Sequence, residues 1–205
     1  SSAASDVYKR QVFFPAYFTE RLDWPLGWFL ILTTVIYAVN LPFNLLYGRV
    51  GDKAGWARTV KWAGCISCGV TLLLVYFVPM ISVDLGLPDG LGFALTLVCG
   101  ALFGVSLAGF VPLSPIAVSL NPERPGAAMA AYNLGVGGAV AAGPALVAIF
   151  YPLVGATGLV LIFVGLFALA MLMNRSLYGT QPGFDGVPRK AETTPALSEP
   201  LTESR

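Results

Sequence analysis

Long apolar runs without an interior charge constrain this 205-residue chain more than any other feature. A helix of roughly 20 such residues crosses the hydrocarbon core of a bilayer. Charged residues make up 11% of the chain, whereas soluble domains carry about a quarter. A soluble protein with a large core is therefore disfavoured, and the sequence predicts an all-α membrane protein.

Five full spans are predicted, at 26–47, 60–81, 91–120, 127–151 and 153–174. The third is long for a bilayer, so we expect it to tilt or to end early near Pro112 or Pro115. Only Pro152 and its neighbours separate the fourth from the fifth. Residues 12–19 reach about 12 Å as a helix, which is too short to span. We interpret them as the end of a truncated span, and the chain as a fragment.

The two ends of the chain differ from this transmembrane bundle of residues 12–174. Residues 1–11 (SSAASDVYKRQ) resemble a foreign adapter or tag remnant and are left out of the fold reasoning. Residues 175–205 are rich in Pro, Gly, Glu, Thr and Ser. We predict a disordered cytoplasmic tail there, because such a segment buries too little apolar surface to offset the entropy lost on ordering.

The charges at the span ends alternate in sign along the chain. One set of ends carries Arg49, Lys53, Arg58, Lys61, Arg124 and Arg175. The other set carries Glu20, Arg21, Asp23, Asp84 and Asp89. Because cationic residues collect on the cytoplasmic side, we predict a multi-pass protein of the plasma (bacterial inner) membrane with its C-terminus in the cytoplasm.

The composition argues against several classes of function. A net charge of +1 gives no reason to expect nucleic acid as a partner, and the absence of histidine excludes a histidine metal site. Cys65 and Cys68 have a C-x-x-C spacing, but like Cys99 they lie inside apolar runs, where we expect packing rather than redox or zinc chemistry. An enzyme would need a nucleophile–base pair or metal ligands converging at one depth. We expect no enzyme, no metal and no cofactor.

Between the first two spans lies the segment 48–58 (GRVGDKAGWAR), whose glycines predict a short reversal of the chain. The segment resembles the G-x-x-x-D-[RK]-x-G signature of the major facilitator superfamily. The matching residues are Gly48, Asp52, Lys53 and Gly55, with Arg58 as the later basic residue. Trp56 stands where that family usually has Arg.

The resemblance implies a conformational switch at this segment. Asp52 would interact with the positive N-terminus of a neighbouring helix and with Arg58, which would latch one transport state. The alternative is a loop whose basic residues only fix the topology.

A closer resemblance, to the ribitol and D-arabinitol permeases of that superfamily, extends over nearly all of residues 12–174. The similar blocks are NLPFNLLYG at 40–48, VGDKAGW at 50–56, LAGFVP at 107–112, GAAM at 126–129 and GPA at 143–145. The resemblance implies the C-terminal six-helix half of a twelve-span fold, from the end of span seven to span twelve. It further implies a missing N-terminal half and proton-coupled uptake of a small neutral polyol by alternating access.

A polar stripe marks the first full span. Thr33, Tyr37, Asn40 and Asn44 fall within about 60° of one another on a helix. Such groups are unfavourable in hydrocarbon unless they are satisfied, so the stripe must face protein or a wet cavity. We predict that these residues bind a polyol together with Asn133 of the fourth span; hydrogen bonding between helices is the alternative.

Small residues at a spacing of four predict close helix packing in the third and fourth spans. These residues are Gly100, Gly104, Gly135 and Gly143, the last followed by Pro144. No charged residue lies in the interior of any span, so we expect the proton-coupling group at a helix end or in the absent half. A carrier of a small organic acid or a sugar, or a non-transporting membrane fragment bathed in lipid, stays open as an alternative.

Overall fold

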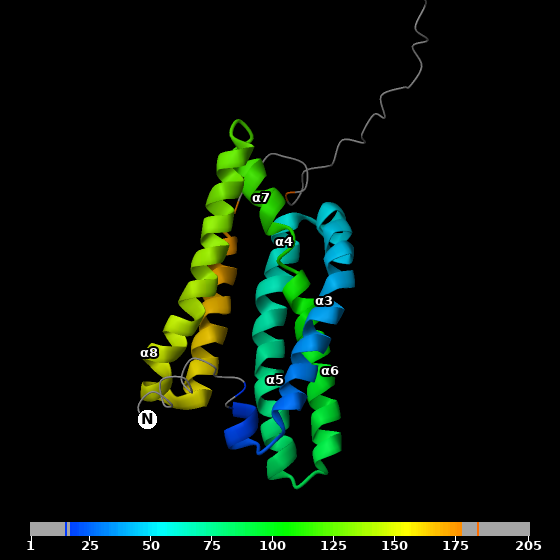
Figure 1. The fold of residues 1–205 in the computed structure, drawn as a ribbon. Coiled ribbons are helices and arrows are strands. Elements are labelled where there is room, and N and C mark those ends of the chain that lie inside the picture. The colour runs from blue at the N-terminus through cyan, green and yellow to red at the C-terminus, as the bar shows by residue number, and fades with distance from the viewer. Residues whose placement is uncertain (1–14, 16, 178–183, 185–205) are drawn as a thin grey trace, which may run out of the picture.

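The computed structural model describes residue 15, residues 17–177 and residue 184, and its elements in that part of the chain are helical. Three long helices lie side by side in Figure 1: α3 (Leu26–Ala54), α5 (Ser67–Asp84) and α6 (Asp89–Ala108). The longest helix, α8 (Pro125–Asn174), consists of two arms that fold back on each other beside these three helices (Figure 1). The short π-helix η1 (Tyr17–Arg21) precedes α3.

The reversal after the first span occurs at a single glycine. Helix α3 runs through Gly48 and Gly51 to Ala54, so the predicted end of the first span at residue 47 is wrong, although the reversal falls within the predicted segment 48–58. The chain turns at Gly55, whose φ of 100° is a conformation that residues with a Cβ rarely adopt. Beyond it, α4 (Trp56–Thr59), the π-helix η2 (Val60–Ile66) and α5 follow one another as one uninterrupted helical segment.

The third predicted span is interrupted near Pro112, as expected. Helix α6 ends at Ala108, and α7 (Leu113–Leu120) follows four residues of turn. In that turn the amides of Gly109, Phe110 and Val111 bond to carbonyls three residues earlier. Such bonds tighten a helix end, and proline then removes the next donor.

The last two predicted spans are the two arms of α8. Its Gly155 has φ 68° and ψ −171°, which is not helical, and the chain reverses there (Figure 1). The predicted boundary at Pro152 is therefore three residues early, because Pro152 stays within the helical first arm. In the described residues four helical segments are long and apolar enough to cross a membrane, and the fourth contains both arms.

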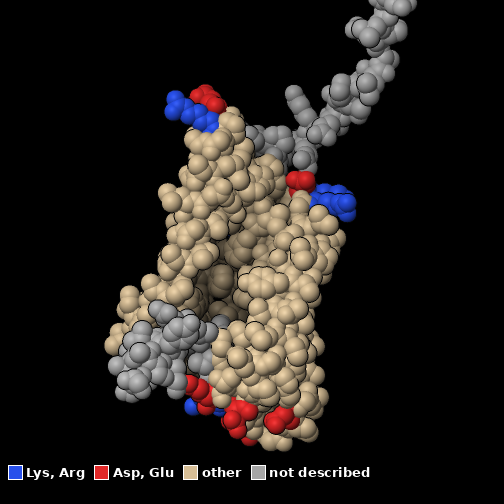
Figure 2. Space-filling view, in the orientation of Figure 1, with Lys and Arg blue, Asp and Glu red and all other residues tan. Residues whose placement is uncertain are grey.

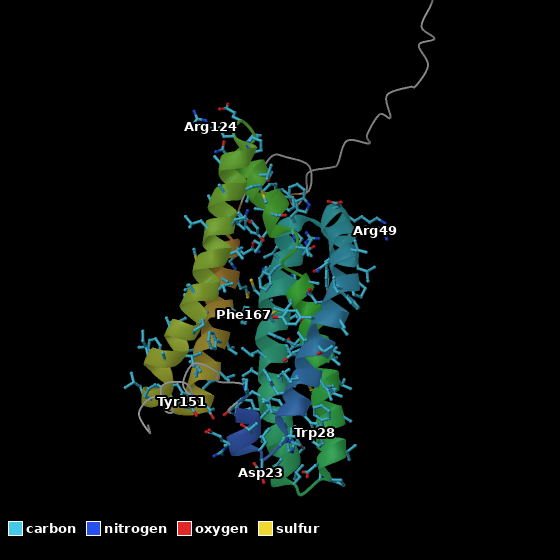
Figure 3. The ribbon with its side chains drawn as sticks, in the orientation of Figure 1. Asp23, Trp28, Arg49, Arg124, Tyr151 and Phe167 are labelled. Carbon is cyan, nitrogen blue, oxygen red and sulfur yellow. The ribbon has the colours of Figure 1, made fainter. Side chains whose placement is uncertain are left out.

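Charged side chains lie at the two ends of the molecule, and the middle of the visible face carries none (Figure 2). Arg49 and Arg124 lie at one end and Asp23 at the other (Figure 3). This is the separation that the alternating charges predict. Many large apolar side chains of α3 and of the first α8 arm are exposed, for example Leu45 and Leu134. A lipid or protein environment suits such a surface better than water does.

Candidate functional site

The polar stripe of α3 lies at the edge of the contact between α3 and α6. Asn40 follows Leu32 and Ile36 at one-turn intervals, and both of these pack against glycines of α6. The amide of Asn40 donates to the backbone carbonyl of Gly104 at 3.2 Å. Asn44 in turn donates to the side-chain oxygen of Asn40 at 3.1 Å. Asn40 therefore joins two helices by a hydrogen bond. This is the role expected if the stripe serves helix packing rather than polyol binding.

Close approach of the two helices depends on Gly104. A Cβ placed there would overlap the backbone carbonyl of Ile36, and one placed at Gly100 would overlap the side chain of Leu32. These two predicted packing glycines thus lie in a tight contact. In contrast, Gly135 and Gly143 of α8 have nothing within 4 Å among the described residues, and Pro144 is exposed. Their packing role stays a prediction.

Thr33 and Tyr37 make no hydrogen bond to α6 among the described residues. The Tyr37 side chain is 63% exposed, and within residues 17–177 its hydroxyl has no hydrogen-bond partner. The Thr33 hydroxyl bonds to the Phe29 carbonyl of its own helix at 2.9 Å, a common way to satisfy a threonine in an apolar helix. Tyr37 and the remaining acceptor of Asn44 are the groups of the stripe best able to receive a solute.

Asn133 lies apart from this stripe. It is exposed on the first arm of α8, and α8 packs against α5, η2 and α7 rather than against α3. On the visible face of the molecule a hollow opens beside α8, and it shows no charged side chain (Figure 2). The structure therefore does not bring Asn133 together with the α3 stripe, and their shared role in solute binding stays a prediction.

An apolar groove lies where the second arm of α8 meets η2 and α5. It has a volume of about 160 Å³ and is lined by residues such as Cys65, Gly69, Val164 and Phe167. Phe167 lies between α8 and α5 in Figure 3. Such a lining offers no hydrogen-bonding side chain to a polyol, so this groove is not a candidate solute site.

Two buried hydrogen-bond networks were not predicted from the sequence. Between α5 and α6, the hydroxyls of Ser67 and Ser106 lie 2.5 Å apart. Nearer the acidic end, the Tyr17 hydroxyl donates to the Tyr76 carbonyl at 2.7 Å, and the Tyr76 hydroxyl lies 2.8 Å from that of Thr157. The second network links η1, α5 and α8. In the sequence these residues are recognisable only as polar residues within apolar runs. Their partners could not be predicted, because they lie far away along the chain.

The Tyr17 contact lies one turn before a proline of α5. Pro79 has no N–H, so the carbonyl four residues earlier, that of Val75, loses its helical donor. The next carbonyl along the chain, that of Tyr76, receives the Tyr17 hydroxyl. The two rings stack with centroids 4.7 Å apart. Helix η1 is thus attached to α5 by a hydrogen bond and a ring contact.

The segment 48–58 forms the corner where α3 meets α4. The indole N–H of Trp56 donates to an Asp52 carboxylate oxygen at 3.2 Å, across the break at Gly55. A Cβ at Gly51 would lie 2.9 Å from Pro112, so the end of α3 also packs against the start of α7. Gly48 lies inside α3, and Lys53 and Arg58 are exposed. The predicted contacts of Asp52 with Arg58 and with a helix N-terminus stay predictions.

One residue beyond α8 joins this corner. Phe184 is 4% exposed and packs in a cluster with Val60, Cys65 and Ile116. Its ring lies 5.7 Å from that of Trp56, at an interplanar angle of 64°. The predicted disordered tail otherwise lies outside the described residues, apart from 175–177, as does the predicted adapter at 1–11. Among the described residues no group of three or more His, Cys, Asp or Glu side chains could hold a metal ion.

Comparisons with known proteins show the family of the chain. The sequence pattern of the Major Facilitator Superfamily matches residues 10–203. The chain is 33% identical over 166 residues to the alpha-ketoglutarate permease of Bacillus subtilis (strain 168), covering 81% of this chain and 36% of that protein. It is 36% identical over 172 residues to the putative transporter YoaB of the same organism, covering 84% and 40%.

A third relative is the D-arabinitol transporter of Klebsiella pneumoniae, which is 30% identical over 173 residues, covering 84% of this chain and 39% of that protein. The chain thus spans well under half the length of these relatives. No solved structure matches the chain.

Proposed function

Because the chain belongs to the Major Facilitator Superfamily, we propose that it is the C-terminal six-helix half of a secondary transporter for a small polyol such as ribitol or arabinitol. Uptake is coupled to a proton and proceeds by alternating access, in which this bundle moves against a six-helix half that precedes it. The carrier lies in a bacterial inner membrane, with its basic span ends and its C-terminus in the cytoplasm.

The observation that carries this proposal is a set of uncharged hydrogen-bonding side chains on spans that have no charged residue in their interiors. Tyr37 and Asn44 offer donors and acceptors that suit hydroxyl groups, and Asn133 offers more on α8. Neither residues 62–122 nor residues 125–174 contain Lys or Arg. A neutral solute needs no opposite charge in such a cavity, and the name of the D-arabinitol transporter is consistent with it.

A small organic acid is the second candidate substrate. The observation in its favour is the 33% identity to an alpha-ketoglutarate permease, slightly above that to the D-arabinitol transporter. A dianion would need cationic groups in the path, because an unpaired charge in hydrocarbon is unfavourable. The interiors of the spans supply none, so under this alternative the cations come from the span ends or from the other half of the carrier.

Uptake assays distinguish the two candidates. Cells that express the complete carrier are given labelled ribitol, D-arabinitol or alpha-ketoglutarate, with and without a protonophore. We expect uptake of a polyol that is lost when the proton gradient collapses. Uptake of alpha-ketoglutarate with no polyol uptake would replace the polyol proposal with the organic acid, and polyol uptake that resists the protonophore would remove the proton coupling.

Substitutions test the candidate solute contacts. Tyr37→Phe and Asn133→Ala should raise the KM for the polyol about two- to tenfold, since each removes a hydrogen bond to the solute. Asn121→Ala is the matched control, because Asn121 is exposed between α7 and α8 outside the spans. Surface expression is measured for each variant. An unchanged KM in both variants would take these residues out of the solute path.

A further inference from the structure

Trp56 lies between the Asp52 carboxylate at the end of α3 and Phe184, a residue beyond α8. Its indole N–H donates to Asp52 at 3.2 Å. Its ring also lies against Gly51, with 3.4 Å between the indole Cδ1 and a Cβ built on that glycine. The remaining ring surface meets Phe184. One side chain thus contacts the end of α3 and a residue that follows α8 by ten positions.

The bond between Trp56 and Asp52 crosses a break in the helix. Gly55 lies between them with φ 100°, so the corner is held by side chains rather than by a continuous helical backbone. An indole has a single donor and no positive charge. It therefore orients one carboxylate oxygen and, unlike an arginine at the same position, brings no positive charge to it.

Phe184 is packed from several sides. It is buried among Val60 of η2 and Ile116 of α7, with Met171 of α8 and Leu177 packed beside the same cluster. Three elements, η2, α7 and α8, thus contribute to this cluster. Ring pairs at this separation and angle stabilise a contact beyond the area that they bury. Loss of the Phe184 ring would free the indole to rotate away from Asp52.

We propose that Phe184 holds the Trp56 indole against Asp52, so that a single residue beyond α8 sets the position of this carboxylate. Trp56 is then a positioning residue for Asp52, and Phe184 acts on Asp52 through it. The consequence for transport rests on the proposed function, in which Asp52 stabilises one of two conformations. The contact itself does not.

The contact is tested first on this chain in lipid nanodiscs. The chain has four tryptophans, so ¹⁵N-tryptophan labelling gives four indole N–H resonances, which Trp→Phe variants assign. Asp52→Asn and Phe184→Ala should both move the Trp56 resonance and speed its hydrogen exchange about two- to tenfold. The Trp24 and Trp28 resonances, at the opposite end of the bundle, should stay unchanged and report intact folding.

The matched control is Phe43→Ala, which removes a ring of α3 whose contact is with Tyr47 rather than with the corner. It should leave the Trp56 resonance in place. If Phe184→Ala also disturbs Trp24 and Trp28, Phe184→Leu keeps the apolar volume and carries the test. A Trp56 resonance that is unaffected when the Phe184 ring is removed would overturn the proposal, as would one that is unaffected by Asp52→Asn.

The consequence for switching is tested in the complete carrier by accessibility labelling of the two membrane faces. Phe184→Ala should change the ratio of inward- to outward-open states about two- to tenfold in the direction that Asp52→Asn changes it. In a Trp56→Arg background, the new side chain can pair with Asp52 without Phe184, so Phe184→Ala should have no further effect. An equal effect in both backgrounds would contradict the role of Trp56. If the carrier transports no polyol, the resonance and labelling results still decide this proposal.

Discussion

Replacing Gly104 with alanine tests the contact that joins the first and third spans. Gly104 is buried in α6 against the backbone of α3, and a Cβ there would overlap the carbonyl oxygen of Ile36. It would also lie 3.1 Å from the carbonyl carbon and 3.2 Å from the Cα of Ile36. Because these atoms are backbone, no rotamer change relieves the overlap. The helices must separate, and the bond from Asn40 to the Gly104 carbonyl must lengthen.

The size of the effect follows from opposing contributions. Overpacking of a tight contact destabilises a protein by about 1–3 kcal/mol, and weakening the Asn40 bond adds about 1 kcal/mol. Alanine has a higher helix propensity than glycine, and this difference stabilises the folded chain by up to about 1 kcal/mol. The net loss is about 2 kcal/mol, which for a protein of this size lowers the Tm by about 4–8 °C.

The three buried cysteines provide the assay. Cys65, Cys68 and Cys99 are free and buried, so a fluorogenic maleimide reacts with them as the chain unfolds in detergent. The fluorescence of the Gly104→Ala chain should rise at a temperature about 4–8 °C below that of the parent chain. Gly137→Ala is the control, because that helical glycine has nothing within 4 Å and should not lower the Tm. A Gly104→Ala chain as stable as the parent would refute the reasoning about the α3–α6 contact.

Two further substitutions test contacts of α8 by the same thermal assay. Tyr76→Phe removes the bond to Thr157 and should lower stability by about 1 kcal/mol; an unchanged Tm would mean that this bond does not hold α8 against α5. Gly155→Ala forces a residue with a Cβ into φ 68° and should lower stability by about 1–2 kcal/mol. Gly143→Ala, in open helical surface, is its control, and equal behaviour of the two variants would place the reversal elsewhere.

The sequence predicted where apolar spans occur better than where they end. Each run of apolar residues formed a helix because length and composition alone determine that tendency in lipid. The ends were wrong at Gly48 and at Pro152 because both residue types are tolerated inside membrane helices when neighbouring groups compensate. The reversals at Gly55 and Gly155 depend on a positive φ, and composition does not say which glycine adopts it.

The candidate site was predictable as a pattern but not as a set of partners. Helical spacing placed Tyr37, Asn40 and Asn44 on one stripe, since that spacing is local. The partner of Asn40 is Gly104, 64 residues away, and it depends on how two helices pack. The buried position of Phe184 was missed for a different reason. Composition averages over the whole tail, whereas a single aromatic residue can bury itself against the bundle.

The topology of the two exposed connections tests the central claim most directly. Leu85 and Asn121 are exposed in the connections after α5 and after α7. Each is replaced with cysteine, and the two variants are labelled with a membrane-impermeant maleimide in intact cells and in inverted vesicles. A transporter bundle with its basic ends in the cytoplasm predicts that Leu85→Cys reacts only from outside and Asn121→Cys only from inside. Labelling of both from the same side of the membrane would contradict the account.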